Sequence, residues 1–443
     1  MSLKRRLMPH VAQALTSRGR RAVGRGLAEL RRRLAGRPHR VRYFHRACDP
    51  YALVTVQVLA DLERRFDIQI TPHVVFDLPQ DMYPERALLD AYAVTDARRL
   101  AGLYGLAFPD GAAPAGEDIA RHAALVLAGL QTDAGFADTA QAVGRAVLAG
   151  DWAALTAIED AHRDRDPSAG WARLAQSEAL LGELGHYLSA SFFYGGEWYW
   201  GLDRLDHLER RLAGLGLARD GGGTPAFERT WRLGDGPAVA AAPDRPIELF
   251  FSVRSPYSYI ALERTLRLAR RWRVPVALRP VLPMMMRGLP VPRVKRVYIL
   301  TDAKREADKL GLPFGRIADP LGAATERCYA LVDHATDRGK RADFLLSFMR
   351  GAFADGIDGA TDAGMKRIVE RAGLDWAAAR PHLDDPDWRA WAEDNRRALT
   401  AMGLWGVPCF RYGAVTAWGQ DRLWVIEQAV RRQEEVASGG ALG

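Results

Sequence analysis

Cysteine is scarce in this sequence, and its spacing excludes two common kinds of site. The 443 residues contain three cysteines, Cys48, Cys328 and Cys409, without a Cys-x-x-Cys pair or a zinc-type cluster. We therefore expect neither a disulfide framework nor a metal site. A reducing cytoplasm is the simplest compartment for such a chain, and we predict a cytoplasmic protein.

Long apolar runs and evenly spread charge are also missing. No uninterrupted apolar stretch reaches the length of a membrane span. Residues 1–42 hold 13 Lys or Arg against one acid, Glu29, so their net charge is +12. Because the whole chain has a net charge of +8, the rest of the chain carries −4. The basic character therefore belongs to an N-terminal extension, which we place at residues 1–39. Several of its apolar residues would line one side of a helix: Leu15, Val23, Leu27, Leu30 and Leu34.

Two alternatives remain open for this extension. It is either a surface helix attracted to anionic lipid or nucleic acid, or a solvated basic segment. The remainder of the chain has no aromatic-basic motif of an RNA- or DNA-binding module, so no specific nucleic-acid partner is expected. A weak contact with a membrane surface through the basic N-terminus is the partner contact that this segment suggests. The oligomeric state stays open.

The rest of the sequence repeats itself. Aligning Pro50 with Pro256 gives an offset of 206, at which "AYAVTDARRLAGLYGLAF" (91–108) matches "VYILTDAKREADKLGLPF" (297–314). Further on, "FFYGGEWYWGLDRLDHLE" matches "FRYGAVTAWGQDRLWVIE" at an offset of 218. Three collinear matches, counting the one around the prolines, predict two copies of one domain.

The boundaries of the copies follow from these matches and from composition. The first copy is predicted at residues 40–215 and the second at residues 245–435. Residues 216–244 between them are rich in Gly, Pro and Ala and are interpreted as a linker. Residues 436–443 form a C-terminal tail.

Each copy has the pattern of an α/β domain. A β-type run ("VRYFHR" or "IELFFSV") precedes an amphipathic helix that begins with proline, and a second strand follows. This βαβ unit favours two parallel strands. A long helical segment comes next, and the second copy ends in a strand, a turn at Tyr412-Gly413-Ala414, a strand and a helix. The pattern predicts a thioredoxin-like fold with a helical insertion, duplicated in tandem.

The sequence Ser255-Pro256-Tyr257-Ser258 lies at the first strand-to-helix junction of the second copy. A thioredoxin-like redox enzyme has its two cysteines at such a junction, where this chain has serines. Serine is favoured as an N-cap and proline at the first helical position. The positive end of the helix stabilises an anion placed there. Ser255 is thus either a helix cap alone or part of an anion site.

The second copy resembles a known family. "SVRSPYSYIALE", "RPVL", "GVPCF" and "WGQDRL" occur in the order found in 2-hydroxychromene-2-carboxylate isomerases and kappa-class glutathione transferases, members of the wider DsbA-like family. The similarity covers essentially all of residues 245–435. The first copy follows it in architecture, with weaker motifs.

The resemblance implies a glutathione site in the second copy. Ser255 would donate a hydrogen bond to the glutathione thiolate, and Pro408 would be a cis-proline whose neighbour Val407 pairs with the peptide backbone of glutathione. Gln420 and Asp421 would hold its γ-glutamyl end, with helix capping as the alternative. Lys295 resembles a lysine that meets a glutathione carboxylate, and a solvated surface lysine is the alternative.

The first copy departs from this pattern. Asp49 stands in the place of Ser255, and its negative charge would oppose a thiolate at the same helix end. Other family positions are also changed, to Leu89, Ala190 and Leu202. We interpret this copy as a degenerate domain. Cys48 beside Asp49 is expected to be a poor nucleophile.

These observations predict a glutathione-dependent isomerase or transferase that acts on a small, unsaturated, aromatic-derived substrate. The glutathione thiolate, held by Ser255, would add to an electrophilic carbon. Two alternatives remain open: a non-catalytic DsbA-like adaptor or binding protein, and a monothiol oxidoreductase that uses Cys48 or Cys409.

Overall fold

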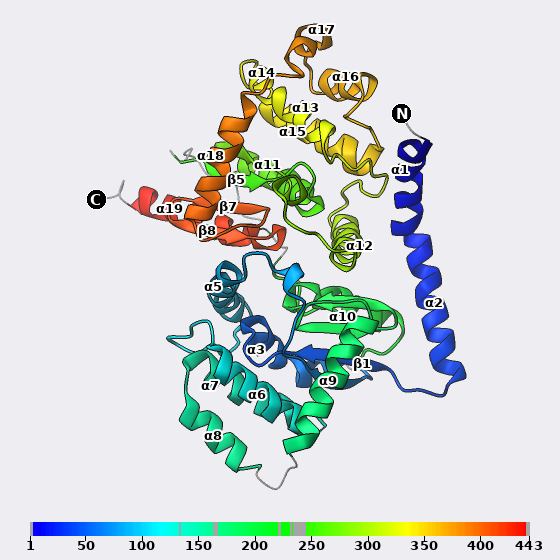
Figure 1. Cartoon of the computed structure of the whole chain (residues 1–443), viewed down its shortest axis with the longest axis vertical. Coiled ribbons are helices and arrows are strands. Elements are labelled where there is room, and N and C mark those ends of the chain that lie inside the picture. Colours follow the sequence, from blue (N-terminus) through cyan, green and yellow to red (C-terminus); the bar gives the residue numbers. More distant parts are fainter. Residues whose placement is uncertain are drawn as a thin grey trace. The chain divides into compact units, whose positions relative to one another are not determined.

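A computed structural model of the chain describes residues 3–132, 134–162, 167–219, 223–230, 233 and 245–439. The chain divides into two compact units, which are described separately. The N-terminal unit comprises residues 22–230, and the C-terminal unit comprises residues 231–443 together with residues 1–21 (Figure 1). Within the described residues, no helix is long and apolar enough to cross a membrane.

The N-terminal unit contains one four-stranded sheet with helices inserted between its second and third strands. The strand order is β2-β1-β3-β4; β1 is parallel to β2 and antiparallel to β3, and β3 forms a hairpin with β4. Its elements after residue 39 are β1 (Arg40–His45), α3 (Pro50–Val56), α4 (Leu59–Arg65), β2 (Gln69–Val74), η1 (Gln80–Met82), α5 (Arg86–Tyr104), α6 (Glu117–Leu130), α7 (Phe136–Ala149), α8 (Trp152–Asp160), α9 (Pro167–Glu183), β3 (Ser191–Tyr194), β4 (Glu197–Trp200), η2 (Leu202–Arg204) and α10 (Leu205–Gly214).

The C-terminal unit has a sheet of the same topology. The strand order is β6-β5-β7-β8, with the β5–β6 pair parallel and the other two pairs antiparallel. Its elements are β5 (Ile247–Phe251), α11 (Pro256–Trp272), β6 (Val276–Pro280), η3 (Met284–Arg287), α12 (Arg293–Lys309), α13 (Ala323–Ala330), α14 (Val332–Thr336), α15 (Arg341–Arg350), the π-helical turn η4 (Gly351–Asp355), α16 (Asp362–Arg371), α17 (Trp376–Ala379), η5 (Arg380–His382), α18 (Trp388–Ala401), β7 (Cys409–Tyr412), β8 (Val415–Trp418), η6 (Gln420–Arg422) and α19 (Leu423–Gly439).

The repeat in the sequence thus corresponds to two sheets with one order and one set of strand directions. The predicted βαβ unit and the closing strand–turn–strand–helix are present in both units. The core of each lies between the sheet and its helices. The central strands carry the most deeply buried side chains, such as Tyr43 and Phe250, neither of which has any exposed surface.

The helix after the first strand differs between the units. In the C-terminal unit α11 is continuous over 17 residues, whereas the corresponding segment of the N-terminal unit is split into α3 and α4. The break falls after "VTVQV", where β-branched residues weaken the helix. The side chain of Gln57 forms two hydrogen bonds of 2.9 Å with the backbone of Ala107, which fixes the chain at the break.

The basic N-terminal residues are helical for most of their length, in α1 (Leu3–Thr16) and α2 (Arg18–Leu34). At the start of α2, Arg18 and Arg21 form ion pairs with Asp308 of the C-terminal unit. Later in α2, Arg25 pairs with Glu197 of the N-terminal unit. Residues 3–34 therefore divide between the two units, although we expected one separate segment.

Part of the predicted linker also belongs to the N-terminal unit. The Asp67 N–H donates to the Leu217 carbonyl over 2.8 Å, and Phe227 is 6% exposed. The N-terminal unit therefore extends to residue 230 instead of ending at 215. Residues 234–244 of the predicted linker and residues 440–443 of the predicted tail lie outside the described residues, and α19 continues to Gly439.

Candidate functional site

Strand register in the C-terminal unit brings the predicted site residues to one edge of the sheet. Phe250 of β5 pairs with Cys409 of β7, so the chain that leaves β5 starts beside Pro408. The N–H of Gly419, just past the end of β8, donates to the Pro408 carbonyl over 2.9 Å. The start of α11, the 407–408 peptide and the turn at 419–421 consequently share this edge.

Ser255 is the N-cap of α11. Its backbone is extended, with φ −88° and ψ 119°, and its Oγ accepts a hydrogen bond from the Ser258 N–H over 3.2 Å. Pro256 follows at the first helical position, as the sequence predicts. The side chain is half-buried, so the Ser255 hydroxyl keeps its own proton for another acceptor at the positive end of the helix.

Ser258 has a different role. It has no exposed surface, and its Oγ accepts a hydrogen bond from the Ser252 N–H over 3.3 Å. That bond connects the first turn of α11 to the end of β5. Ser258 therefore holds the junction together, and Ser255 is the serine of the pair that reaches the surface.

The Val407–Pro408 peptide bond is cis. Among the described residues, no hydrogen bond involves the backbone N–H or carbonyl of Val407. The Nζ of Lys295, in the first turn of α12, lies 5.8 Å from the centre of the Trp405 ring. Lys295 is thus close to the loop that contains the cis-proline, and its contact with a glutathione carboxylate stays a prediction.

Gln420 and Asp421 are in η6 at the same edge, and both are buried, at 1% and 8% exposure. The Gln420 side chain accepts from Arg264 Nη1 over 3.0 Å and donates to Glu306 Oε2 over 2.9 Å. It also contacts Asp421. Arg264, 4% exposed, donates a further bond of 2.6 Å to the Gln420 carbonyl.

The buried Gln420 network places the Arg264 guanidinium among three carboxylates. Burial lowers the pKa of the Arg264 guanidinium, and the charges of Asp421, Glu306 and Glu427 act in the opposite direction. A contact of these groups with the γ-glutamyl end of glutathione stays a prediction. In the structure their hydrogen bonds join α11, α12 and the turn after β8.

Sequence reasoning missed a tyrosine–aspartate pair next to the cap. Tyr257 donates to Asp302 Oδ2 over 2.7 Å, and Asp302 is 1% exposed. In the N-terminal unit Tyr51 donates to Asp96 Oδ2 over 2.9 Å. The signal was present, because Thr-Asp-Ala recurs at the offset of 206 that also relates the two tyrosines.

The three thiols are unsuited to nucleophilic chemistry. Burial raises the pKa of the Cys48 thiol, and burial raises the pKa values of Cys328 and Cys409 well above their usual range. Cys409 has no exposed surface, and its Sγ donates to the Gly406 carbonyl over 3.0 Å. Among the described residues, no group of three or more His, Cys, Asp or Glu could hold a metal ion.

The corresponding edge of the N-terminal unit is closed by its own side chains. Asp49 caps α3 by accepting from the Tyr51 N–H over 2.8 Å. Ser189, which aligns with Val407, donates from its Oγ to Asp49 Oδ2 over 2.6 Å. Burial raises the pKa of Asp49, and the hydrogen bonds from Ser189 and the Tyr51 backbone act against that rise. Ala190 occupies the place of the cis-proline.

Comparisons with known proteins agree with this architecture. Residues 246–431 match the family model of the DSBA-like thioredoxin domain. The 2-hydroxychromene-2-carboxylate isomerase of Pseudomonas putida is 24% identical over 198 residues, covering 42% of this chain and 94% of that protein.

Two solved structures are also similar. The first is a 2-hydroxychromene-2-carboxylate isomerase, with 21% identity and a TM-score of 0.38, covering 44% of this chain and 98% of that one. The second is the cytosolic disulfide reductase DsbM of Pseudomonas aeruginosa with GSH, with 19% identity and a TM-score of 0.32, covering 43% and 98%. The family match and the strand order agree, and residues 246–431 of this chain form a DsbA-like thioredoxin domain.

Proposed function

We propose that the C-terminal unit is a glutathione-dependent isomerase or transferase that acts on a small, unsaturated, aromatic-derived molecule. The main support is the half-buried Ser255 hydroxyl at the N-terminus of α11, at the same sheet edge as the Val407 backbone. The Pseudomonas putida relative is a 2-hydroxychromene-2-carboxylate isomerase, and we take the class of reaction from that name. A reducing cytoplasm is the compartment we propose, on the spacing of the cysteines.

The groups at this edge fit the parts of glutathione as follows. The Ser255 hydroxyl would donate a hydrogen bond to the thiolate, and the helix N-terminus would favour its negative charge. The Val407 N–H and carbonyl would pair with the extended tripeptide as one more strand. Lys295, beside Trp405, would meet a carboxylate.

Bound glutathione would supply a thiolate that adds to an electrophilic carbon of the substrate. Later elimination of glutathione from the adduct would give isomerisation, and retention of the adduct would give glutathione transfer. The residues of the chain would bind and orient that group. Ser255 would keep the sulfur ionised without becoming a redox partner, because a hydroxyl forms no disulfide. Cys409 takes no part, since it is buried with a raised pKa.

Calorimetry with glutathione tests this proposal, with Ser255→Ala as the probe and Asp49→Ala as the matched control at the other N-cap. We expect Ser255→Ala to weaken the ultraviolet absorbance of the bound thiolate and to lower turnover by about tenfold to a hundredfold, the value of a hydrogen bond to a charged group. Asp49→Ala should leave both unchanged. The substrate of choice is 2-hydroxychromene-2-carboxylate.

A non-catalytic adaptor is the second candidate, and one observation favours it. Gln420 and Asp421, two of the predicted ligand residues, already have internal partners. If the wild-type chain binds no glutathione, or if Ser255→Ala and Asp49→Ala behave alike, the enzyme proposal fails and the adaptor is favoured.

A further inference from the structure

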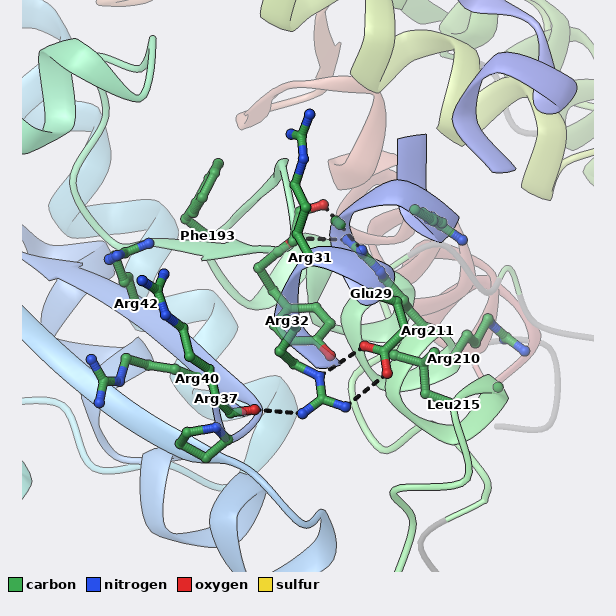
Figure 2. A pocket seen from close by; sticks show the side chains of 16 residues that line it. Glu29, Arg31, Arg32, Arg37, Arg40, Arg42, Phe193, Arg210, Arg211 and Leu215 are labelled. Carbon is green, nitrogen blue, oxygen red and sulfur yellow. Dashed lines mark hydrogen bonds and ion pairs between the residues drawn. The ribbon is translucent and has the colours of Figure 1, made fainter. Parts of the chain in front are cut away.

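Helix α2 and the sheet of the N-terminal unit enclose a pocket of about 570 Å³, away from the Asp49 cap. Figure 2 shows that its walls are rich in arginine. The inward face of α2, residues 25–32, forms one side, and the chain entering β1, the β3–β4 turn and α10 form the rest. The lining residues that the argument uses are Arg37, Arg40, Arg42, Phe193 and Arg211.

Some of the arginines are neutralised and hold the walls in place. Arg25 donates two hydrogen bonds to one oxygen of Glu197 and one to the other, and Arg211 lies 3.1 Å from the same carboxylate. Arg32 pairs with Glu29 over 2.8 Å, and Arg210 pairs with Glu228 over 2.6 Å. These contacts fix α2 and α10 at the pocket.

A second group has no acid to balance it. Within the described part of the chain, Arg37, Arg40 and Arg42 form no ion pair. Burial lowers the pKa of the half-buried Arg42, and the charges of Arg40 and Arg37 lower it further. The three side chains lie at one end of the pocket in Figure 2. Crowding like charges without a counter-charge is unfavourable, and a bound anion would relieve it.

The C-terminal unit provides an internal comparison. At the register position of Arg42, which faces Phe193 across β1 and β3, it has Glu248 facing Arg411 across β5 and β7. Arg411 donates to the two Glu248 oxygens over 2.8 Å and 2.6 Å. Arg279 also lies 3.6 Å from Glu248. The same place in the fold therefore has a carboxylate paired with arginines in one unit and an arginine without a counter-charge in the other.

We propose that this pocket of the N-terminal unit binds a ligand with two or more phosphate groups. Guanidinium groups form paired, planar hydrogen bonds with phosphate oxygens, and three unbalanced arginines suit a ligand with several negative charges. The volume falls in the range of small-molecule sites. This binding is independent of the glutathione site proposed for the C-terminal unit.

Two sources of phosphate are compatible with the pocket. One is a soluble phosphorylated molecule. The other is the headgroup of an anionic phospholipid, because the opposite face of α2 carries exposed apolar side chains of the kind that enter a membrane interface. Those side chains are Val23, Leu27, Leu30 and Leu34, which are 63%, 48%, 52% and 80% exposed.

Calorimetry of the full chain with inorganic pyrophosphate and tripolyphosphate tests the soluble source. We expect binding that weakens about tenfold or more in Arg40→Gln/Arg42→Gln, because each removed guanidinium loses a charge-assisted contact. The matched control is Arg145→Gln/Arg267→Gln, which removes the same charge from two exposed arginines elsewhere. The control should bind as the wild type does, and glutathione binding should be unchanged in both variants.

Sedimentation with vesicles tests the lipid source. Vesicles that contain cardiolipin, an anionic phospholipid with two phosphate groups, should retain the wild type more than the Arg40→Gln/Arg42→Gln variant, and pure phosphatidylcholine vesicles should retain neither. Binding in either arm that depends on these two arginines supports the proposal and identifies the source. Absence of binding in both arms, or equal loss in the control variant, overturns it.

A further variant guards against a loss caused by misfolding. Arg42→Glu/Phe193→Arg recreates the Glu248–Arg411 pair of the other unit, so it should fold with an unchanged thermal unfolding temperature. Its phosphate binding should nevertheless weaken about tenfold or more, because Arg42, the half-buried member of the three unbalanced arginines, is replaced by an acid that pairs with the new arginine. Retained binding in this folded variant would contradict the proposal.

Discussion

Ser189 donates a hydrogen bond to Asp49, with 2.6 Å between its Oγ and the Asp49 Oδ2. The bond joins the loop before β3 to the N-cap of α3, the two places that correspond to Val407 and Ser255 in the other unit. An internal contact thus occupies, in the N-terminal unit, the edge that we propose for a ligand in the C-terminal unit.

The Ser189–Asp49 contact predicts a measurable coupling. Ser189→Ala leaves the half-buried Asp49 carboxylate without one of its donors, so the free energy of unfolding should fall by about 1–2 kcal/mol. Asp49→Asn should make the loss of Ser189 less harmful, because an amide is cheaper to bury than a carboxylate. A double-mutant cycle by urea unfolding measures the coupling; strictly additive effects would contradict it.

The raised thiol pKa values predict slow alkylation at neutral pH. Burial disfavours the thiolate at all three cysteines, so iodoacetamide should modify them slowly in the folded chain and rapidly after denaturation. Insulin reduction should be negligible. If the wild type reduces insulin and Cys48→Ser/Cys409→Ser does not, the monothiol oxidoreductase alternative is correct.

The Arg25–Glu197 pair predicts acid sensitivity of the N-terminal unit. Burial alone would raise the pKa of Glu197, but the hydrogen bond and charge of Arg25, with the charge of Arg211, lower it to about 2 from 4.5. A lowered carboxylate pKa adds stability above its unfolded value near 4.5, and that stability is lost as the pH falls toward 2.

Urea unfolding of the wild type and Glu197→Gln measures this dependence. The wild type should be more stable by on the order of 2 kcal/mol at about pH 6, and the difference should shrink at about pH 3. A difference that is constant between these conditions would argue against the pair as its origin.

The Gln420 network predicts a large stability cost for a small change. Gln420→Ala removes one hydrogen bond from each of two buried charged side chains, Arg264 and Glu306, so the free energy of unfolding should fall by about 1–3 kcal/mol. If Gln420 has only this structural role, glutathione affinity should stay the same at temperatures where the variant is folded. Weaker binding in the folded variant would indicate a ligand contact as well.

The fold of each unit could be predicted from the sequence, because the main signals for its elements are local. The β-type run at β5, the Ser255 cap with Pro256, and the glycine turn at Gly413, which has a φ of 58°, each depend on neighbours in the chain. The break between α3 and α4 was missed, because the side-chain bonds of Gln57 to Ala107 join residues 50 positions apart.

The site was predictable to a smaller extent for the same reason. Helix-capping residues could be recognised from the sequence, but the partners of Gln420 are 114 and 156 positions away. The arginine pocket needs α2, β1 and α10 to be folded together before the excess charge at Arg42 becomes apparent. Charge counting along the chain could locate the basic segment but not its pocket.

The two units keep one backbone hydrogen bond in common although the residue that accepts it differs. The Gly201 N–H donates to the Ala190 carbonyl over 2.8 Å, just as the Gly419 N–H donates to Pro408, although the proline itself is absent from the first repeat. The loop closure therefore tolerates exchange of the residue that defines the site. A laboratory exchange of this loop between the two units would therefore start from a backbone that is already compatible with both.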